Sequence, residues 1–350
     1  MTKDEISKFV GQENLTIMQA MQKIDENTFG ILFFTDGSGK LSGCVTDGDI
    51  RRFLLKGGKM TAFAYEAAEH KPKNATSMEE AKALFHNKNY VVIPIVDEFD
   101  RVIDLYCGDT QQLKKSRGSL DIPVVINAGG RGTRLDPFTR VLPKPLIPVG
   151  ELPIIELIMG EYQTYDCNDF HIIVNYKKNL MKAYFNDNEN HYNITWYDEE
   201  KPLGTGGGLS LLRGKLKSTF FFANCDALLK TNYESIVKFH KEHNNVITMI
   251  CAYKNVSIPY GVVEMGENGI IESMTEKPMM SFLTNTGIYI VEPEVIDDIE
   301  DDESIGFPDI VERERKKGKK VAVFPVSEND WMDMGQLSEL EKMRAKLYGE

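Results

Sequence analysis

The chain has 350 residues, more than one ordinary hydrophobic core accommodates, so we expect two domains, or three. Its formal net charge of −12 disfavours nucleic-acid binding, because phosphate backbones are held by clustered lysine and arginine side chains. No run of about 18 apolar residues occurs, and the N-terminus lacks the apolar core of a signal peptide. We therefore expect a cytoplasmic protein that does not bind membranes.

An internal repeat organises the first third of the chain. The segment Asn14–Ile24 returns sixty positions later as Asn74–Leu84, and each copy is followed by two apolar stretches joined by a turn. One copy, with a helix, two strands and a short helix, is too small to bury both of its faces. We expect the copies, at about residues 1–58 and 59–115, to pack together.

This α+β repeat resembles a tandem pair of CBS domains. The first copy carries Gly43-Cys-Val-Thr46-Asp-Gly-Asp49, which matches the family pattern of Gly, two apolar residues, Thr or Ser, two variable residues and Asp. The resemblance implies that Thr46 contacts a nucleotide phosphate and that Asp49 binds ribose hydroxyls. In the second copy Tyr106 stands at the Thr position, although Asp109 is present. The pair is either an adenine-nucleotide sensor or a structural module, and we expect a homo-oligomer formed through it.

After a polar linker at residues 116–121, apolar strands alternate with amphipathic helices. In chain order, the sequence predicts a strand at 124–127, a helix near 153–165, a strand at 169–174, a helix near 178–185, a strand at 194–197 and a helix at 337–348. This alternation is typical of an α/β domain, here residues 122–350, with a Rossmann-like, mixed but mostly parallel sheet. Its ligands should collect at the carboxyl ends of the strands.

The loop after the first of these strands, Gly129-Gly-Arg-Gly-Thr-Arg134, is rich in glycine and arginine, and Pro143-Lys144-Pro145 follows it. It is not a P-loop, because no Lys-Ser/Thr pair occurs at the required spacing. Nor is it a dinucleotide fingerprint, because Leu135 replaces the third small residue. Glycines still let backbone N–H groups approach an anion, and Arg134 and Lys144 add positive charge. The loop predicts phosphate binding.

The same loop resembles the signature of the sugar-1-phosphate nucleotidylyltransferases, or nucleotide-sugar pyrophosphorylases, although Asn127 replaces the Ala or Met usual in that family. Further matches occur in family order: Pro202–Leu209, Phe221–Asp226, Pro259–Glu264, Glu276–Pro278, Asn285–Tyr289 and Trp331–Gly335. The resemblance implies transfer of a nucleoside monophosphate from a nucleoside triphosphate to a sugar 1-phosphate, with release of pyrophosphate.

The resemblance also implies roles for individual residues. Arg134 would hold the β- and γ-phosphates, Lys144 the α-phosphate and Lys277 the attacking sugar phosphate. Asp226 and Asp333 would bind Mg²⁺. The nucleotide contacts would be Ala128, Gly129, Gly130, Gly132, Thr133, Pro202, Gly204, Thr205 and Asn224. The sugar contacts would be Tyr260, Gly261, Glu276 and Asn285.

Several alternatives stay open. Asp226 could cap a helix, and the glycines at 204–208 could form a flexible loop. The chain could also be a nucleotide-sensing regulator without turnover, since Cys225 replaces a glycine usual in the family. Fusion of a CBS pair to this domain resembles guanylyltransferases that activate amino-sugar, mannose- or heptose-type phosphates. That favours GTP over UTP, CTP and dTTP.

Two further features have simpler interpretations. The acidic run from Glu292 to Glu303 is interpreted as a solvated helix face. The five cysteines are widely scattered without metal-ligand spacing, which predicts reduced, structural thiols.

Overall fold

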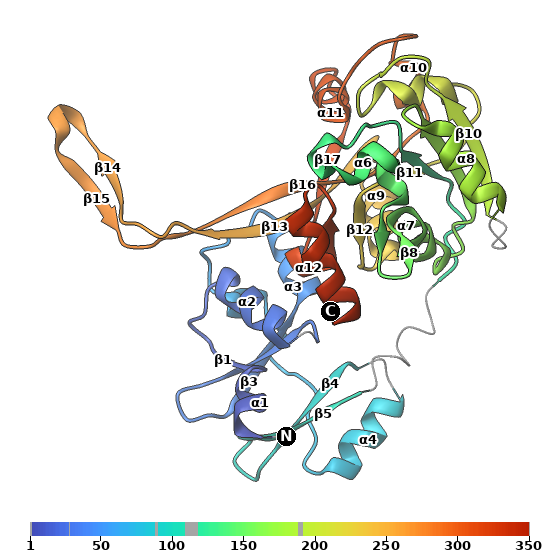
Figure 1. Ribbon diagram of the computed structural model, residues 1–350. Helices are drawn as coiled ribbons and strands as arrows, with labels where there is room; N and C mark the ends of the chain where they lie inside the picture. Colours follow the sequence, from blue (N-terminus) through green and yellow to red (C-terminus); the bar gives the residue numbers. More distant parts are fainter. Residues whose placement is uncertain (1, 28, 88–89, 109–117, 188–191, 350) are drawn as a thin grey trace. The chain divides into compact units, whose positions relative to one another are not determined.

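The computed structural model describes residues 2–27, 29–87, 90–108, 118–187 and 192–349 (Figure 1). The chain divides by packing into two compact units. The first comprises residues 1–116 together with 254–282, and the second comprises 117–253 together with 283–350. Residues 254–282, which the sequence analysis assigned to the α/β domain, thus group with the N-terminal residues. Asp109 and linker residues 116 and 117 lie outside the described residues.

The N-terminal unit contains both copies of the repeat, with their elements in the same order. After α1 (Lys3–Ser7), the first copy has β1 (Val10–Gln12), α2 (Ile17–Asn27), β2 (Ile31–Thr35), β3 (Leu41–Thr46) and α3 (Asp47–Leu55). The second copy has α4 (Met78–Asn87), β4 (Val92–Val96) and β5 (Val102–Cys107). In each copy the two longer strands pair antiparallel.

The two copies share one hydrophobic core. Its buried side chains come from both halves of the unit: Phe9, Phe33, Leu41, Val92, Val96 and Leu105. The Lys40 ammonium and the Asp100 carboxylate also form an ion pair between the copies, at 2.8 Å. This is the packing expected of units too small to bury both faces alone.

The first unit also includes an antiparallel hairpin, β14 (Val262–Met265) and β15 (Ile271–Thr275). The long strands β13 (Ile247–Ser257) and β16 (Met279–Val291) connect this hairpin to the second unit along the chain. Apolar side chains of the hairpin are exposed, among them Met265, Ile270 and Met274.

A seven-stranded mixed sheet forms the second unit, in the order β10-β9-β6-β11-β16-β13-β17. The strands not yet given are β6 (Val124–Asn127), β9 (Asp169–Val174), β10 (Asn193–Asp198), β11 (Phe220–Asn224) and β17 (Val321–Val326). The first four strands of the sheet run parallel, and β16 is antiparallel to β11. The prediction of a mixed, mostly parallel sheet is confirmed.

Both faces of this sheet are buried, as the side chains of β6 and β11 demonstrate. Val124 and Phe221 belong to one hydrophobic cluster, whereas Val125 and Phe222 belong to a second cluster on the opposite face. The first cluster includes residues of α7 (Ile154–Gln163), α8 (Lys178–Asp187), α9 (Tyr233–Glu242) and α12 (Leu337–Tyr348). The second includes residues of α10 (Glu294–Asp297), α11 (Phe307–Lys316) and the 3-10 helix Gly207–Leu212.

The acidic run from Glu292 to Glu303 is largely solvated, as interpreted, because the side chains of Glu294, Asp301 and Asp302 are 57%, 85% and 75% exposed; the helical part of the run is short. Its only helix, α10, has 4 residues, and Val295, Ile296 and Ile299 are buried in the core. Its carboxylates form ion pairs, described below, with basic side chains of neighbouring segments. Within the described ranges, no helix is both long and apolar enough to cross a membrane.

Phe222→Ala should destabilise the second unit by about 3–5 kcal/mol, because the removed ring leaves a cavity in a close-packed core. Phe222 is fully buried, and its ring centroid lies 4.6 Å from that of Phe307. Chemical denaturation followed by near-UV circular dichroism measures the change. The control is Phe138→Ala at a ring that is 49% exposed, for which we expect a shift within about 0.5 kcal/mol. Equal effects of the two substitutions would contradict this packing.

Candidate functional site

A glycine allows the phosphate loop, residues 128–134, to lie against Lys144. The loop follows the carboxyl end of β6, and Ala128 N–H donates to Ile173 O at 2.8 Å. Gly132 has a φ of +66°, and a Cβ added there would lie 3.0 Å from Lys144 Cβ. Three predicted ligand-binding residues of the loop are exposed: Gly130, Thr133 and Arg134. The loop can therefore present backbone donors and a guanidinium to an anion.

The fold brings Lys144, Asp226 and Asp333 together. Lys144 is buried, and its ammonium forms an ion pair with the Asp226 carboxylate. Strand β12 (Ala227–Leu229) pairs antiparallel with β18 (Trp331–Asp333), and in this register Ala227 faces Asp333. Met334 N–H then donates to Asp226 O at 2.9 Å. Two carboxylates that are far apart in the sequence thus reach one place through a pair of short strands.

The electrostatics of this group favour a bound cation. Burial and the neighbouring Asp226 carboxylate raise the pKa of Asp333 to about 6, although Lys144 and Arg134 oppose the shift. Within the described part of the chain, no group of three or more His, Cys, Asp or Glu side chains could hold a metal ion. Two carboxylates nevertheless suit Mg²⁺, which binds one or two protein carboxylates together with substrate phosphates. Asp226 and Asp333 therefore fit the predicted metal role.

A second glycine-rich segment, the base loop (residues 202–208), lies beside the phosphate loop. The Asn127 side-chain amide donates to Thr205 O at 3.2 Å and ties the two loops together. An alanine at position 127 could not make this bond, so the departure from the family pattern has a structural use. Pro202, Gly204 and Thr205 are exposed, which leaves this edge of the loop open to a ligand.

Sequence reasoning missed Glu199, whose carboxylate lies between the two loops. A Cβ added to Gly129 would lie 2.8 Å from Glu199 Oε2, and one added to Gly208 would lie 2.6 Å from Glu199 Oε1. The residue is only 4% exposed, and its Oε1 has no hydrogen-bond partner. Burial raises the pKa of Glu199 to about 7, partly offset by a hydrogen bond from the Leu203 backbone.

A buried carboxylate with one oxygen that lacks a hydrogen-bond partner is costly, and a ligand that donates to that oxygen would offset the cost. The sequence carried one signal that could have found it. Two adjacent acidic residues, Glu199 and Glu200, lie just before the base loop, separated from it by Lys201.

Two predicted asparagines lie on the paired central strands, Asn224 at the end of β11 and Asn285 within β16. A Cβ on Gly287, which has a φ of +77°, would lie 2.4 Å from Asn224 Nδ2. Asn285 is exposed; its amide donates to the Tyr289 hydroxyl at 2.6 Å, and its Oδ1 accepts from Gly287 N–H at 3.0 Å. The short chain of contacts through Gly287 holds both side chains in defined positions.

The other predicted sugar-binding residues lie together at the base of the β14–β15 hairpin, within the first unit. Lys277 N–H donates to Tyr260 O at 3.2 Å, and Lys277 has a φ of +47°. A Cβ on Gly261 would lie 3.0 Å from Glu276 Oε2. A non-glycine residue in the left-handed region is costly, and such residues cluster at functional sites.

The predicted CBS ligands bond to each other. Thr46 caps the N-terminus of α3; its hydroxyl accepts from Asp49 N–H at 3.2 Å and donates to Asp49 Oδ2 at 2.6 Å. Asp49 also forms an ion pair with Arg52. This reciprocal capping box accounts for both residues without a ligand. In the second copy, Tyr106 packs edge-on against Phe85.

Cys225 is a buried thiol beside the candidate metal ligand Asp226. Burial and the Asp226 charge raise its pKa to about 12, so it stays protonated and is not a nucleophile at neutral pH. All five cysteines lie among the described residues and carry free thiols.

Comparison with known proteins matches the chain to two family models. Residues 123–349 match the family model described as nucleotidyl transferase, and residues 9–56 match the model described as CBS domain. The chain is 34% identical over 225 residues to the mannose-1-phosphate guanyltransferase of Saccharomyces cerevisiae and 35% identical over 232 residues to that of Schizosaccharomyces pombe. These matches cover 61% of this chain and 61% and 60% of the relatives, so the chain spans about three-fifths of their length.

Among solved structures, HddC from Yersinia pseudotuberculosis is similar, with a TM-score of 0.51 and 22% identity. The match covers 64% of this chain and 99% of that chain, and it concerns the fold.

Lys144→Met should destabilise the second unit by about 3 kcal/mol, because it leaves the largely buried Asp226 carboxylate without its cation. In the double variant Lys144→Met/Asp226→Asn the unpaired charge is gone, so most of the loss should be recovered. Thermal and urea unfolding of the four proteins in the mutant cycle measure this coupling. Additive effects of the two substitutions would show that the ion pair is not a stabilising contact.

Proposed function

The chain belongs to the nucleotidyl transferase family, and from that premise we propose that it transfers a nucleoside monophosphate, from GTP in preference, to a sugar 1-phosphate. The products are a nucleoside diphosphate sugar and pyrophosphate. The observation that carries the proposal is the convergence of Lys144, Asp226 and Asp333 beside the phosphate loop.

The reaction needs no nucleophile from the protein. An oxygen of the sugar phosphate attacks the α-phosphorus, and the new P–O bond forms as the bond to the pyrophosphate oxygen breaks. A phosphate monoester is already ionised at neutral pH, so no general base has to remove a proton. The task of the protein is to align the two substrates and to neutralise charge.

The residues of the second unit suit that task. Arg134, exposed at the end of the phosphate loop, would hold the β- and γ-phosphates by its forked donors. Lys144, held in place by its pairing with Asp226, would contact the α-phosphate. Asp226 and Asp333 would hold Mg²⁺, which supplies positive charge to the phosphate oxygens when bound.

Glu199 supports guanine as the preferred base. An ionised carboxylate only accepts hydrogen bonds, and it can accept two side by side. Guanine presents two adjacent donors, N1–H and the N2 amino group. Uracil and thymine present one donor between two carbonyl oxygens, and cytosine and adenine present a donor beside an acceptor. A carboxylate between the two glycine loops therefore discriminates in favour of GTP over UTP, CTP and dTTP.

The sugar is proposed from the hairpin residues and from the relatives. Tyr260, Gly261, Glu276 and Asn285 would bind sugar hydroxyls, and Lys277 would bind the attacking phosphate. Carboxylate and amide groups suit vicinal hydroxyls because each offers more than one hydrogen-bonding atom. The names of the curated relatives support a sugar 1-phosphate such as mannose 1-phosphate.

The alternative is a regulator that binds nucleotides without turnover and senses them through its N-terminal unit. Pyrophosphate release from GTP, UTP, CTP and dTTP, each with a panel of sugar 1-phosphates, separates the two functions. Release with GTP supports the transferase, and no release with any pair supports the regulator. A thermal shift with AMP or ATP that is lost in Asp49→Ala would support a nucleotide-binding N-terminal unit, which we propose to regulate the enzyme.

Arg134→Ala should lower kcat by two to three orders of magnitude, about 3–4 kcal/mol, because one donor to the transition-state phosphates is lost. Initial rates of pyrophosphate release with GTP and mannose 1-phosphate measure the effect. Arg315→Ala, at an exposed arginine of the same unit, is the control and should keep kcat within threefold of wild type. A kcat of Arg134→Ala within that same range would remove Arg134 from the mechanism.

The pH dependence of kcat/KM for GTP should follow the ionisation of the Glu199 carboxylate. Its pKa is raised to about 7, so the carboxylate is mostly protonated at pH 6 and mostly ionised at pH 8. We expect kcat/KM for GTP to fall about tenfold from pH 8 to pH 6, because only the ionised form accepts both guanine donors. Glu199→Gln should lower kcat/KM at pH 8 and flatten the profile. The neighbouring, exposed Glu200→Gln should keep the wild-type profile; a Glu199→Gln profile identical to that of wild type would exclude this role.

A further inference from the structure

The base loop packs tightly against the residues at the start of α11 and just before it. A Cβ on Gly207 would lie 2.0 Å from Glu303 O, and one on Gly204 would lie 2.6 Å from Ile305 O. Gly206 N–H donates to Ile305 O at 3.0 Å, and Ile305 N–H donates to Leu203 O at 3.0 Å. Residues 303–307, the support segment, therefore determine the shape of the base loop.

Thr205 connects this support to the rest of the site. Its hydroxyl accepts from Phe307 N–H at 3.0 Å, at the start of α11, and its backbone carbonyl accepts from Asn127. A displacement of the support segment would thus reach both the base loop and the strand end that leads into the phosphate loop.

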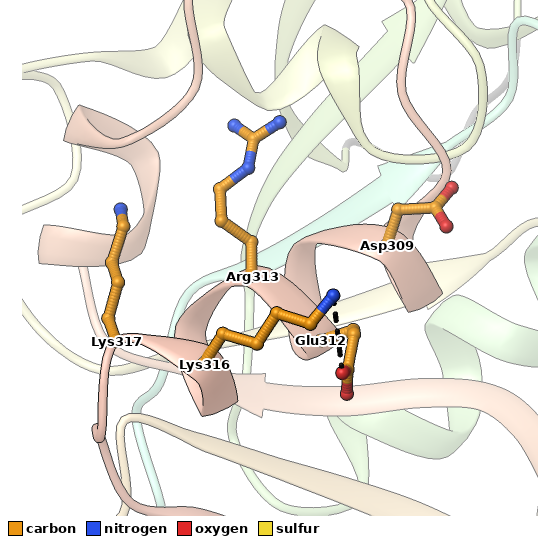
Figure 2. A pocket seen from close by; sticks show the side chains of 5 residues that line it. All are labelled: Asp309, Glu312, Arg313, Lys316 and Lys317. Carbon is orange, nitrogen blue, oxygen red and sulfur yellow. Dashed lines mark ion pairs between the residues drawn. The ribbon is translucent and has the colours of Figure 1, made fainter.

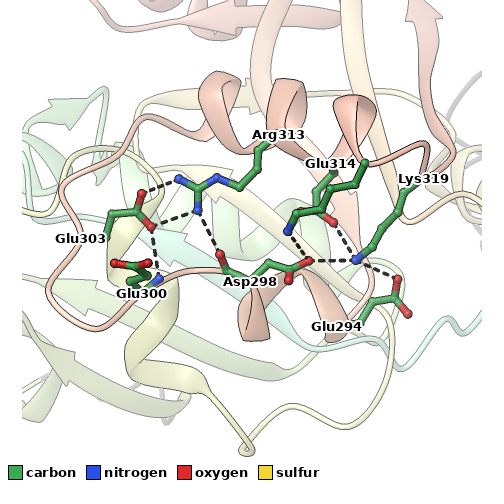
Figure 3. Close-up of polar contacts among 8 residues, drawn as sticks. Glu294, Asp298, Glu300, Glu303, Arg313, Glu314 and Lys319 are labelled. Atoms are coloured by element: carbon green, nitrogen blue, oxygen red, sulfur yellow. Dashed lines mark hydrogen bonds and ion pairs between the residues drawn. The ribbon is translucent and has the colours of Figure 1, made fainter.

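Arg313, on α11, holds the support segment by both of its terminal nitrogens (Figure 3). Its Nη1 donates to Glu303 Oε2 at 3.0 Å and to Asp298 O at 2.9 Å, while its Nη2 donates to Glu303 Oε1. Glu303 Oε2 also accepts from Glu300 N–H at 3.1 Å. Hydrogen bonds to the Arg313 guanidinium are the largest cause of the lowered pKa of Glu303. Paired charged bonds of this kind fix both distance and orientation.

Neighbouring basic side chains hold other residues of the same acidic run. Arg213 donates to Asp301 Oδ1 at 2.5 Å and to Ile299 O. Lys317 and Lys319 each lie 2.9 Å from Asp298 Oδ2, and they lower its pKa to about 2. Residues 298–301, which lead into the support segment, are therefore held by Arg213, Lys317 and Lys319 in addition to Arg313.

A surface hollow of about 470 Å³ lies along α11 and is lined by Asp309, Glu312, Arg313, Lys316 and Lys317 (Figure 2). Its lysines already have acidic partners: Lys316 pairs with Glu312, and Lys317 pairs with Asp298 and Glu314. The hollow is therefore lined by side chains that already belong to ion pairs. The Arg313 side chain is 29% exposed, so its replacement leaves no cavity in the hydrophobic core.

We propose that Arg313 is a positioning residue for the nucleobase. By holding Glu303, it keeps the support segment against the base loop, and so keeps Thr205 and the loop glycines in place around the base that Glu199 contacts. This inference rests on the proposed function and adds to it a residue that touches neither substrate.

Arg313→Ala should raise the KM for GTP about tenfold while kcat and the KM for mannose 1-phosphate change less than threefold, because only the base loop loses its support. Arg313→Lys should restore part of the loss, since lysine supplies the charge without the fork. The matched control is Arg315→Ala, on the same helix, where an exposed arginine pairs with Glu312. We also expect the preference for GTP over UTP to decrease in Arg313→Ala and to persist in the control.

The charge swap Glu303→Arg/Arg313→Glu tests the ion pair itself and should bring the KM for GTP back toward the wild-type value. If the swap protein does not fold, Glu303→Gln replaces it and should raise the KM for GTP in the same direction as Arg313→Ala. The proposal is overturned if Arg313→Ala leaves the KM for GTP unchanged, or if kcat and both KM values change together. Equilibrium binding of GTP to the same variants tests the role of Arg313 independently of turnover. Absence of pyrophosphate release from the wild-type protein would instead contradict the proposed function.

Discussion

The ion pair between Lys144 and Asp226 is the contact on which the candidate site depends. It joins the end of the phosphate-loop region to the end of the central strand β11, and both side chains are largely withdrawn from solvent. Asp333 lies across a two-strand pairing from Ala227, where burial and, to a smaller extent, the Asp226 charge raise its pKa. One buried cation thus faces two carboxylates, so the group retains an excess of negative charge to which a metal ion is suited.

In both glycine-rich loops, the absence of a Cβ atom lets the backbone pack closely against neighbouring residues. Gly132 permits contact with Lys144, and Gly207 permits contact with the support segment. The same closeness leaves Glu199 between the loops with an unpartnered oxygen. In the ligand-free protein, folding holds a proton on Glu199 that the unfolded chain releases above its ordinary pKa. The free energy of unfolding therefore falls as the pH rises toward 7, a cost that a base with two donors would offset.

Much of the fold could be predicted from the sequence, because periodicity reports burial directly. The helix expected near 178–185 is α8, Lys178–Asp187, and the strand expected at 194–197 is β10, Asn193–Asp198. The ion-pair partners of the acidic run from Glu292 to Glu303 could not be predicted, because a local pattern does not reveal residues distant in sequence. Arg213 and Arg313 pair with that run from outside it.

The order of elements, the repeat of the N-terminal unit and the chemical types of the loop residues could be predicted from local periodicity and from motifs within short segments. Which charged side chains come together depends on the folded chain. Asp226 and Asp333 come together through the register of β12 and β18, and Glu199 acquires its raised pKa from burial between two loops. Both depend on distances through space, which no local pattern encodes.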